Sequence, residues 1–113
     1  MKRCRITVLK RHFYEELAKE YGSKGIGKCP MLKEGQIFYA DYAKPDGFCD
    51  EACKAIYQYV FALAQGSGQF YYGDWIEKPG VAICSCNDGL RPVIFKVERT
   101  DEEATINYTQ HHD

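Results

Sequence analysis

One long stripe of apolar residues limits what this chain can fold into. Its members recur at the spacing of one helix face, and the stripe predicts a helix from about residue 51 to residue 65. Asp50 precedes this helix as its expected N-cap, and Gly66 follows its end. Further apolar residues widen the stripe, so we expect the helix to be covered on more than one side. The stripe consists of Ala52, Ile56, Tyr59, Val60 and Leu63.

Short segments on both sides of this helix have the composition of β-strands. Val93, Phe95 and Val97 alternate with more polar residues, so one face of the last strand should be buried. Asn87-Asp88-Gly89 before that strand predicts a hairpin, because these residues tolerate positive φ angles. Phe13, Leu17 and Tyr21 predict a second, short helix over residues 12–21. The expected strands cover residues 3–10, 36–42, 69–72, 81–86 and 91–99.

These elements predict an α+β fold. The chain has 113 residues, which fits one small domain over 1–113, with a partly ordered tail from residue 100. We expect a mainly antiparallel sheet of about four to five strands packed against two helices.

The cysteine count has to be interpreted through the cellular compartment. The first residues lack the apolar core of a signal peptide, and no apolar run is long enough to cross a membrane, so we expect a cytoplasmic protein with no membrane partner. The six cysteines should therefore be thiols rather than a disulfide framework. Their purpose is then packing, metal binding or chemistry.

The amino-terminal third is locally basic, but it does not indicate a nucleic-acid surface. It contains no dense basic run, and the overall pI is near 6.3. Residues 22–28 have the phosphate-loop spacing G-x-x-x-x-G-K, but Cys29 stands where a Ser or Thr should bind magnesium. This segment also follows a predicted helix instead of leading into one, so we interpret it as a flexible basic loop.

Cys49 and Cys53 bracket the first turn of the main helix. The partial positive charge at a helix amino end favours the thiolate form, which makes Cys49 the best-activated candidate. Free cysteine is often buried, and this favours a packing role for Cys53.

Cys84 and Cys86 are two residues apart on one predicted strand and point to the same face. Cys86 lies beside the turn where Asp88 and Arg91 also converge, which resembles a site more than Cys84 does. The cysteines lack the C-x-x-C spacing of zinc ribbons, so a metal site would be assembled from separate loops. His111 and His112 are further ligand candidates, but they lie in the expected tail.

Several motifs together resemble a family of small uncharacterised proteins from anaerobic bacteria and archaea. They are Cys29-Pro30, the EGQIF and PDGFC segments at residues 34–38 and 45–49, Ala52, and CNDGLRPVIFK at residues 86–96. The resemblance covers nearly the whole chain and places cysteine at Cys29, Cys49 and Cys86. The family typically has an aromatic residue where this chain has Cys53. An anaerobic setting also favours an oxygen-sensitive cofactor.

The leading hypothesis is a metal centre held by the thiolates of Cys29, Cys49 and Cys86, either an iron–sulfur cluster or zinc. Three ligands leave a fourth position open to a substrate or other ligand, as in catalytic metal sites. Arg91 would counter the thiolate charge and Asp88 would orient it, so both are candidate catalytic residues. Either a small-molecule substrate or a redox partner fits such a centre.

Two other classes of function stay open. The first is a metal-free thiol enzyme or redox protein with Cys49 as nucleophile and Cys53 or Cys86 as its partner. The second is a structural or interaction module in which the cysteines only pack. The sequence decides neither the reaction nor the oligomeric state.

Overall fold

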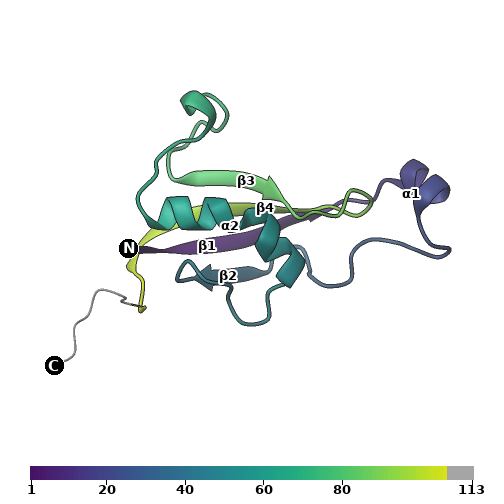
Figure 1. Cartoon of the computed structure of the whole chain (residues 1–113), viewed down its shortest axis with the longest axis horizontal. Coiled ribbons are helices and arrows are strands. Elements are labelled where there is room, and N and C mark those ends of the chain that lie inside the picture. The colour runs from purple at the N-terminus through teal and green to yellow at the C-terminus, as the bar shows by residue number, and fades with distance from the viewer. Residues whose placement is uncertain (107–113) are drawn as a thin grey trace.

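Four antiparallel strands form one sheet in the computed structural model of this chain, which describes residues 1–106 (Figure 1). The strand order is β2-β1-β4-β3. Two α-helices and a short 3-10 turn complete the fold, so the predicted α+β class is confirmed. The strands are β1 (Lys2–Arg11), β2 (Ile37–Ala40), β3 (Val81–Ser85) and β4 (Val93–Glu103), and the helices are α1 (Glu15–Tyr21), α2 (Asp50–Ala64) and η1 (Tyr71–Gly73).

The core lies between α2 and one face of the sheet. The alternation predicted for the last strand holds, since Val93, Phe95 and Val97 are buried on the same face. From the helix, Ile56 and Leu63 are fully buried against them. Burying a side chain of this size stabilises a fold by about 1.5–3 kcal/mol. The apolar stripe of α2 is therefore what fixes the helix on the sheet.

The other face of the sheet is more polar. Arg5 Nε donates to Glu98 Oε1 at 2.8 Å, and Lys96 Nζ lies 3.5 Å from the same oxygen. The hydrogen bond from Arg5 and the charge of Lys96 lower the pKa of Glu98. A polar second face is common in antiparallel sheets, and it explains why the strands alternate.

The helix α1 lies beyond one end of the sheet, whereas α2 covers its face (Figure 1). The expectation that both helices pack on the sheet is therefore wrong for α1. The predicted start at residue 12 is also too early. The backbone N–H groups of His12 and Tyr14 donate to the carbonyls of Pro92 and Leu90 at 2.8 and 2.9 Å, which keeps this segment extended beside the β3–β4 loop.

The strand β4 runs four residues past its predicted end at Arg99. It pairs with the start of β1, where Lys2 lies opposite Glu103 and their side chains form an ion pair at 2.6 Å. The predicted tail therefore begins later than residue 100. His111 and His112 lie outside the described residues.

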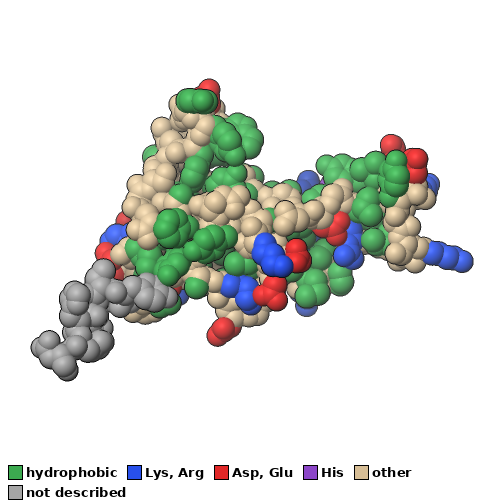
Figure 2. Space-filling view, in the orientation of Figure 1, with side chains coloured by type: hydrophobic (Ala, Val, Ile, Leu, Met, Phe, Trp, Pro, Cys, Tyr) green, Lys and Arg blue, Asp and Glu red, His purple; other side chains and the backbone are tan. Residues whose placement is uncertain are grey.

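The predicted strand over residues 69–72 is wrong. Tyr71 and Tyr72 have positive φ angles of 51° and 65°, and the chain forms the turn η1 instead. The Tyr71 ring packs edge-on against Trp75, and its hydroxyl lies 2.9 Å from that of Tyr59 on α2. Residues 66–80, which we call the aromatic arm, project from the sheet, and Figure 2 shows hydrophobic side chains gathered there.

Neither α1 nor α2 has the length and apolar character needed to span a bilayer, and the same holds for every helix within residues 1–106.

Candidate functional site

A pocket of about 430 Å³ opens beside the amino end of α2. Four segments that are distant in the sequence form its wall: the loop before β2, the start of α2, the β3–β4 loop and the first residue of β4. The lining residues are Cys29, Met31, Leu32, Cys49, Glu51, Ala52, Cys86, Asn87, Asp88, Arg91 and Val93.

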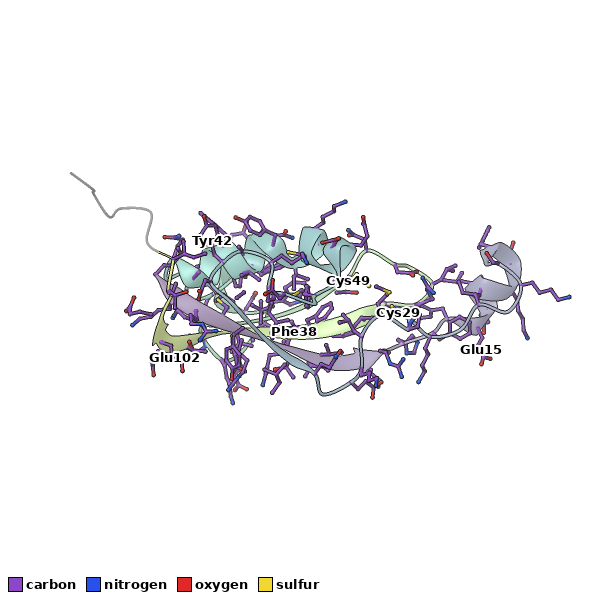
Figure 3. All side chains as sticks on the ribbon, turned by 90° about the horizontal axis from the view of Figure 1, so that it is seen from below. Glu15, Cys29, Phe38, Tyr42, Cys49 and Glu102 are labelled. Atoms are coloured by element: carbon purple, nitrogen blue, oxygen red, sulfur yellow. The ribbon has the colours of Figure 1, made fainter. Side chains whose placement is uncertain are left out.

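Three of the six cysteines lie on this wall, one from each of three loops or element ends. Cys29 belongs to the long loop between α1 and β2, Cys49 precedes α2, and Cys86 follows β3. Figure 3 shows Cys29 and Cys49 near each other where α2 begins. All three are half-buried free thiols. The structure thus places the three cysteines that the sequence selected around one cavity.

The helix α2 begins one residue earlier than predicted, so Cys49 rather than Asp50 is its N-cap. Its carbonyl accepts the first helical hydrogen bond, from the Cys53 N–H at 2.9 Å. No side chain caps this helix end. The thiol of Cys49 therefore sits at the positive end of a 15-residue helix, where a negative charge is stabilised.

The β3–β4 hairpin predicted from Asn87-Asp88-Gly89 is present, but its loop is wider than a tight turn. Cys86 and Val93 close this loop. The Cys86 N–H donates to the Val93 carbonyl at 3.0 Å, and the Val93 N–H donates to Cys86 Sγ at 3.2 Å. The position and direction of this sulfur are thus fixed by backbone.

Asp88 organises the inside of the same loop. Its Oδ1 accepts from the backbone N–H groups of Leu90 and Arg91 at 2.9 and 3.1 Å, and its Oδ2 accepts from Arg91 Nε at 2.8 Å. The Arg91 hydrogen bond is the main cause that lowers the pKa of Asp88. Asp88 therefore holds Arg91 in place, and its orienting role at the sulfurs stays a prediction.

Arg91 is the cation of the pocket. Its pKa is raised first by Asp88 and further by the charges of Cys29 and Cys86, so the guanidinium lies within electrostatic range of both sulfurs. This arrangement fits the counter-charge role predicted for Arg91. A catalytic role for Arg91 or Asp88 stays a prediction.

Cys29 is held through its backbone. Arg11 Nη1 donates to the Cys29 carbonyl at 3.0 Å, and the Arg11 N–H donates to Glu34 Oε1 at 3.0 Å, so the end of β1 ties down the loop. At the start of the loop, the Gly22 N–H caps the carboxyl end of α1 by donating to Ala18 at 2.8 Å. The phosphate-loop spacing therefore follows a helix, as predicted.

The other three cysteines lie away from the pocket. Burial raises the pKa of Cys4 to about 11, although Arg99 opposes it, and burial raises that of Cys84 to about 12. Burial also raises the pKa of Cys53, which lines a separate hollow with Lys44. Thiols in such surroundings stay protonated at neutral pH, which fits the packing role predicted for Cys53.

The sulfurs do not converge as single-ion ligands. Within the described residues, no group of three or more His, Cys, Asp or Glu side chains is arranged to hold one metal ion. The pocket also contains residues that the sequence did not single out, among them Leu32 and Glu51. Leu32 is 3% exposed, and an apolar residue inside a glycine-rich basic loop was the available signal.

Comparisons with protein-family models, curated proteins and solved structures gave no match for this chain.

Proposed function

We propose that this chain is a cysteine-ligated metal-centre protein that holds an iron–sulfur cluster through Cys29, Cys49 and Cys86. The observation that carries the proposal is the shared pocket: three of the six cysteines, from three distant segments, line one cavity. The remaining cysteines lie elsewhere, so the grouping does not simply follow from a high cysteine content.

A cluster suits this pocket better than a single zinc ion. Zinc binds each thiolate at about 2.3 Å, so its ligands must almost touch one another. No such group exists among residues 1–106. A cluster takes each thiolate on a different iron, and its ligands therefore stand farther apart. Zinc remains the alternative metal, and it predicts that the three thiolates move closer together on binding.

The surroundings supply what a cluster needs from a protein. Hydrogen bonds to the ligating sulfurs tune the reduction potential of a cluster, and the Val93 N–H already donates to Cys86 Sγ. Arg91 balances part of the thiolate charge, and Asp88 keeps it in place. Three thiolates leave one iron open to a small-molecule substrate or an electron-transfer partner. The expected cytoplasmic location would keep the thiols reduced.

The test is anaerobic reconstitution with iron and sulfide, followed by iron and sulfide analysis and an absorption spectrum. The wild-type chain should become brown and bind iron in a fixed ratio. The variants Cys29→Ala, Cys49→Ala and Cys86→Ala should each lose most of that iron. Cys53→Ala is the matched control, since this thiol is half-buried but outside the pocket, and it should bind iron like the wild type.

A protein that binds zinc and no iron would contradict the cluster and support zinc as the metal of this site. Equal iron loss in Cys53→Ala and in the three pocket variants would contradict the assignment of the ligands.

A metal-free thiol enzyme is the second candidate, and the position of Cys49 favours it. This thiol lies at an uncapped helix amino end and shares its pocket with Cys86, which would serve as its partner. Under this candidate the chain binds no metal, and Cys49 alkylates faster than the other five thiols. A chain with no metal and six unreactive thiols would support a structural or interaction module instead.

A further inference from the structure

The strand β3 forms one edge of the sheet, and its outer side has no partner. At one end the Cys86 N–H donates to the Val93 carbonyl of β4, and at the other the Arg99 N–H of β4 donates to the Gly80 carbonyl. Because backbone groups alternate along a strand, the odd-numbered residues between these two points turn their N–H and C=O groups away from β4. None of these outward groups has a backbone partner within residues 1–106. They belong to Val81, Ile83 and Ser85.

The space beside this edge is open. A hollow of about 350 Å³ lies there, and it is lined by Tyr59 of α2, Trp75 of the aromatic arm and the exposed Ile83 of β3. The hollow opens to solvent, so an added strand has access to the outward backbone groups.

The edge also lacks the features that normally keep a sheet edge from pairing. Exposed edges are usually protected by charged residues, proline or a β-bulge. The segment Val81–Ser85 contains no charge and no proline, and it pairs with β4 in a regular register. Ile83 stands at its centre and is 39% exposed, on the sheet face that carries Lys96 and Glu98. An exposed apolar residue at this place indicates a surface that another strand covers.

We propose that β3 pairs antiparallel with β3 of a second copy of this chain, about a two-fold axis at Ile83. This register places Ile83 opposite Ile83 of the second copy, and Val81 opposite Ser85 of the second copy. The outward N–H and C=O groups at all three positions then meet as hydrogen-bonded pairs, and the two isoleucine side chains contact each other. A two-fold interface requires such a self-complementary surface. The pairing goes beyond the proposed function and needs no metal.

Charge supports a second copy as the occupant of this edge. The nearest charged residues along the chain on the two sides of β3 are Lys78 and Asp88, and each lies five residues from Ile83. An antiparallel two-fold pair therefore brings Lys78 of one copy toward Asp88 of the other. A parallel pair would bring like charges together.

The aromatic arm supplies the area that a strand of five residues does not supply alone. An interface of ordinary size buries about 800 Å² on each partner, which is roughly a tenth of the 7690 Å² accessible surface of this chain. The arm rises from the amino end of β3 beyond the same edge (Figure 1), so it lies where the second copy docks. Its side chains Tyr71, Tyr72 and Trp75 are all exposed.

Sedimentation equilibrium of the metal-free chain, with its thiols kept reduced, tests the pairing. With rising concentration the wild type should reach twice the chain mass of 13.0 kDa. Ile83→Lys places two lysines opposite each other and should raise the dissociation constant at least about tenfold. Ile37→Lys is the matched control, because Ile37 is likewise exposed but lies on β2 at the opposite edge of the sheet. It should dimerise like the wild type.

Amide hydrogen exchange of the wild type, measured residue by residue by NMR, tests the register without any substitution. Exchange at the three outward residues of β3 should slow at least about tenfold between dilute and concentrated protein. Exchange at Ile37 and Tyr39 of β2 should not change.

Three results would overturn this inference. The first is a chain that stays monomeric at every concentration, and slower exchange at β3 only after another protein is added would then make that protein the occupant. The second is a dimer in which the outward amides of β3 exchange as fast as in the monomer. The third is a dimer that Ile37→Lys weakens as much as Ile83→Lys does. Because all samples are metal-free, none of these results bears on the proposed function.

Discussion

The backbone N–H of Val93 donates a hydrogen bond to Sγ of Cys86 over 3.2 Å, which joins the first residue of β4 to a sulfur of the pocket. Val93 is 1% exposed, so in the folded chain its N–H depends on Cys86 Sγ as acceptor. Cys86 therefore has a structural role in the hairpin in addition to its proposed role as a ligand.

The two roles of Cys86 can be separated by two substitutions. Cys86→Ala leaves the Val93 N–H unpaired and should lower the free energy of unfolding by about 1–3 kcal/mol. Cys86→Ser restores an acceptor and should recover much of this loss. Both variants should still lose iron after reconstitution, because neither offers a thiolate. Urea denaturation of the metal-free proteins gives the stabilities, and a Cys86→Ser variant that binds iron like the wild type would contradict the ligand role.

The six thiols of the metal-free protein should differ in reactivity. At pH 8, thiols with pKa values of about 11 and about 12 are ionised on the order of one part in a thousand or less. Cys4 and Cys84 should therefore react with iodoacetamide at least tenfold more slowly than the pocket thiols. Peptide mass spectrometry over time measures each rate, and denatured protein provides the control in which all six react alike. A fast Cys84 would show that β3 is not packed as described.

Asp88 should make stability depend on pH. Its folded pKa is lowered from the ordinary value of 3.8, mainly by Arg91, so it stabilises the fold above about pH 4. This contribution is lost as the pH falls through the folded pKa. Asp88→Asn should therefore be less stable than the wild type at pH 7, and the difference should shrink below pH 4. Thermal unfolding at several pH values measures this, with the exposed Asp101→Asn as control. A constant difference from pH 7 to pH 2 would refute the stated cause.

The packing of α2 on the sheet should dominate stability. Ile56 is fully buried, and Ile56→Ala should lower the free energy of unfolding by about 2–5 kcal/mol through lost contacts and the cavity that remains. Gln58→Ala, on the exposed side of the same helix, should change it by about 0.5 kcal/mol or less. Denaturation in urea compares the two variants, and similar losses would mean that α2 does not pack by this face.

The backbone of the aromatic arm should be strained at Tyr72, which has a φ angle of 65° and a fully exposed side chain. Such a conformation costs an ordinary residue about 1–2 kcal/mol, and glycine avoids most of this cost. The greater freedom of glycine in the unfolded chain offsets about 0.4–1 kcal/mol. Tyr72→Gly should therefore raise stability slightly. Tyr57→Gly inside α2 is the control and should lower it by about 1 kcal/mol.

Sequence reasoning succeeded where a periodic pattern and burial coincide. The stripe of α2 and the alternation of Val93, Phe95 and Val97 identified the core, because apolar residues recur on one face of each element. It failed at residues 69–72, where Tyr71 does not pair in a strand but packs its ring edge-on against Trp75 and places its hydroxyl within hydrogen-bond distance of that of Tyr59. Strand composition alone cannot reveal such contacts between distant side chains.

Part of the candidate site could be predicted from the sequence, again because local patterns mark it. Cys49 and Cys86 stand next to the predicted ends of a helix and a strand, so their positions follow from local signals. Arg11 holds the loop that carries Cys29, and Leu32 lines the pocket. Both act through contacts between segments that are distant in the sequence. Arg11 has no neighbouring motif that marks it, and the one signal for Leu32 is its apolar side chain inside a basic loop.

The two central strands of the sheet, β1 and β4, come from opposite ends of the described chain and pair from Lys2–Glu103 to Arg11–Val93. During synthesis β1 thus has no partner at the middle of the sheet until the residues of β4 have been made. Pairing between strands so far apart in the sequence slows folding, because a large loop must close before the contacts between the strands can stabilise the sheet. Val93, the first residue of β4, closes the loop that carries Cys86, so this side of the pocket should be among the last parts of the described chain to form, and the proposed metal centre should load after β4 is made.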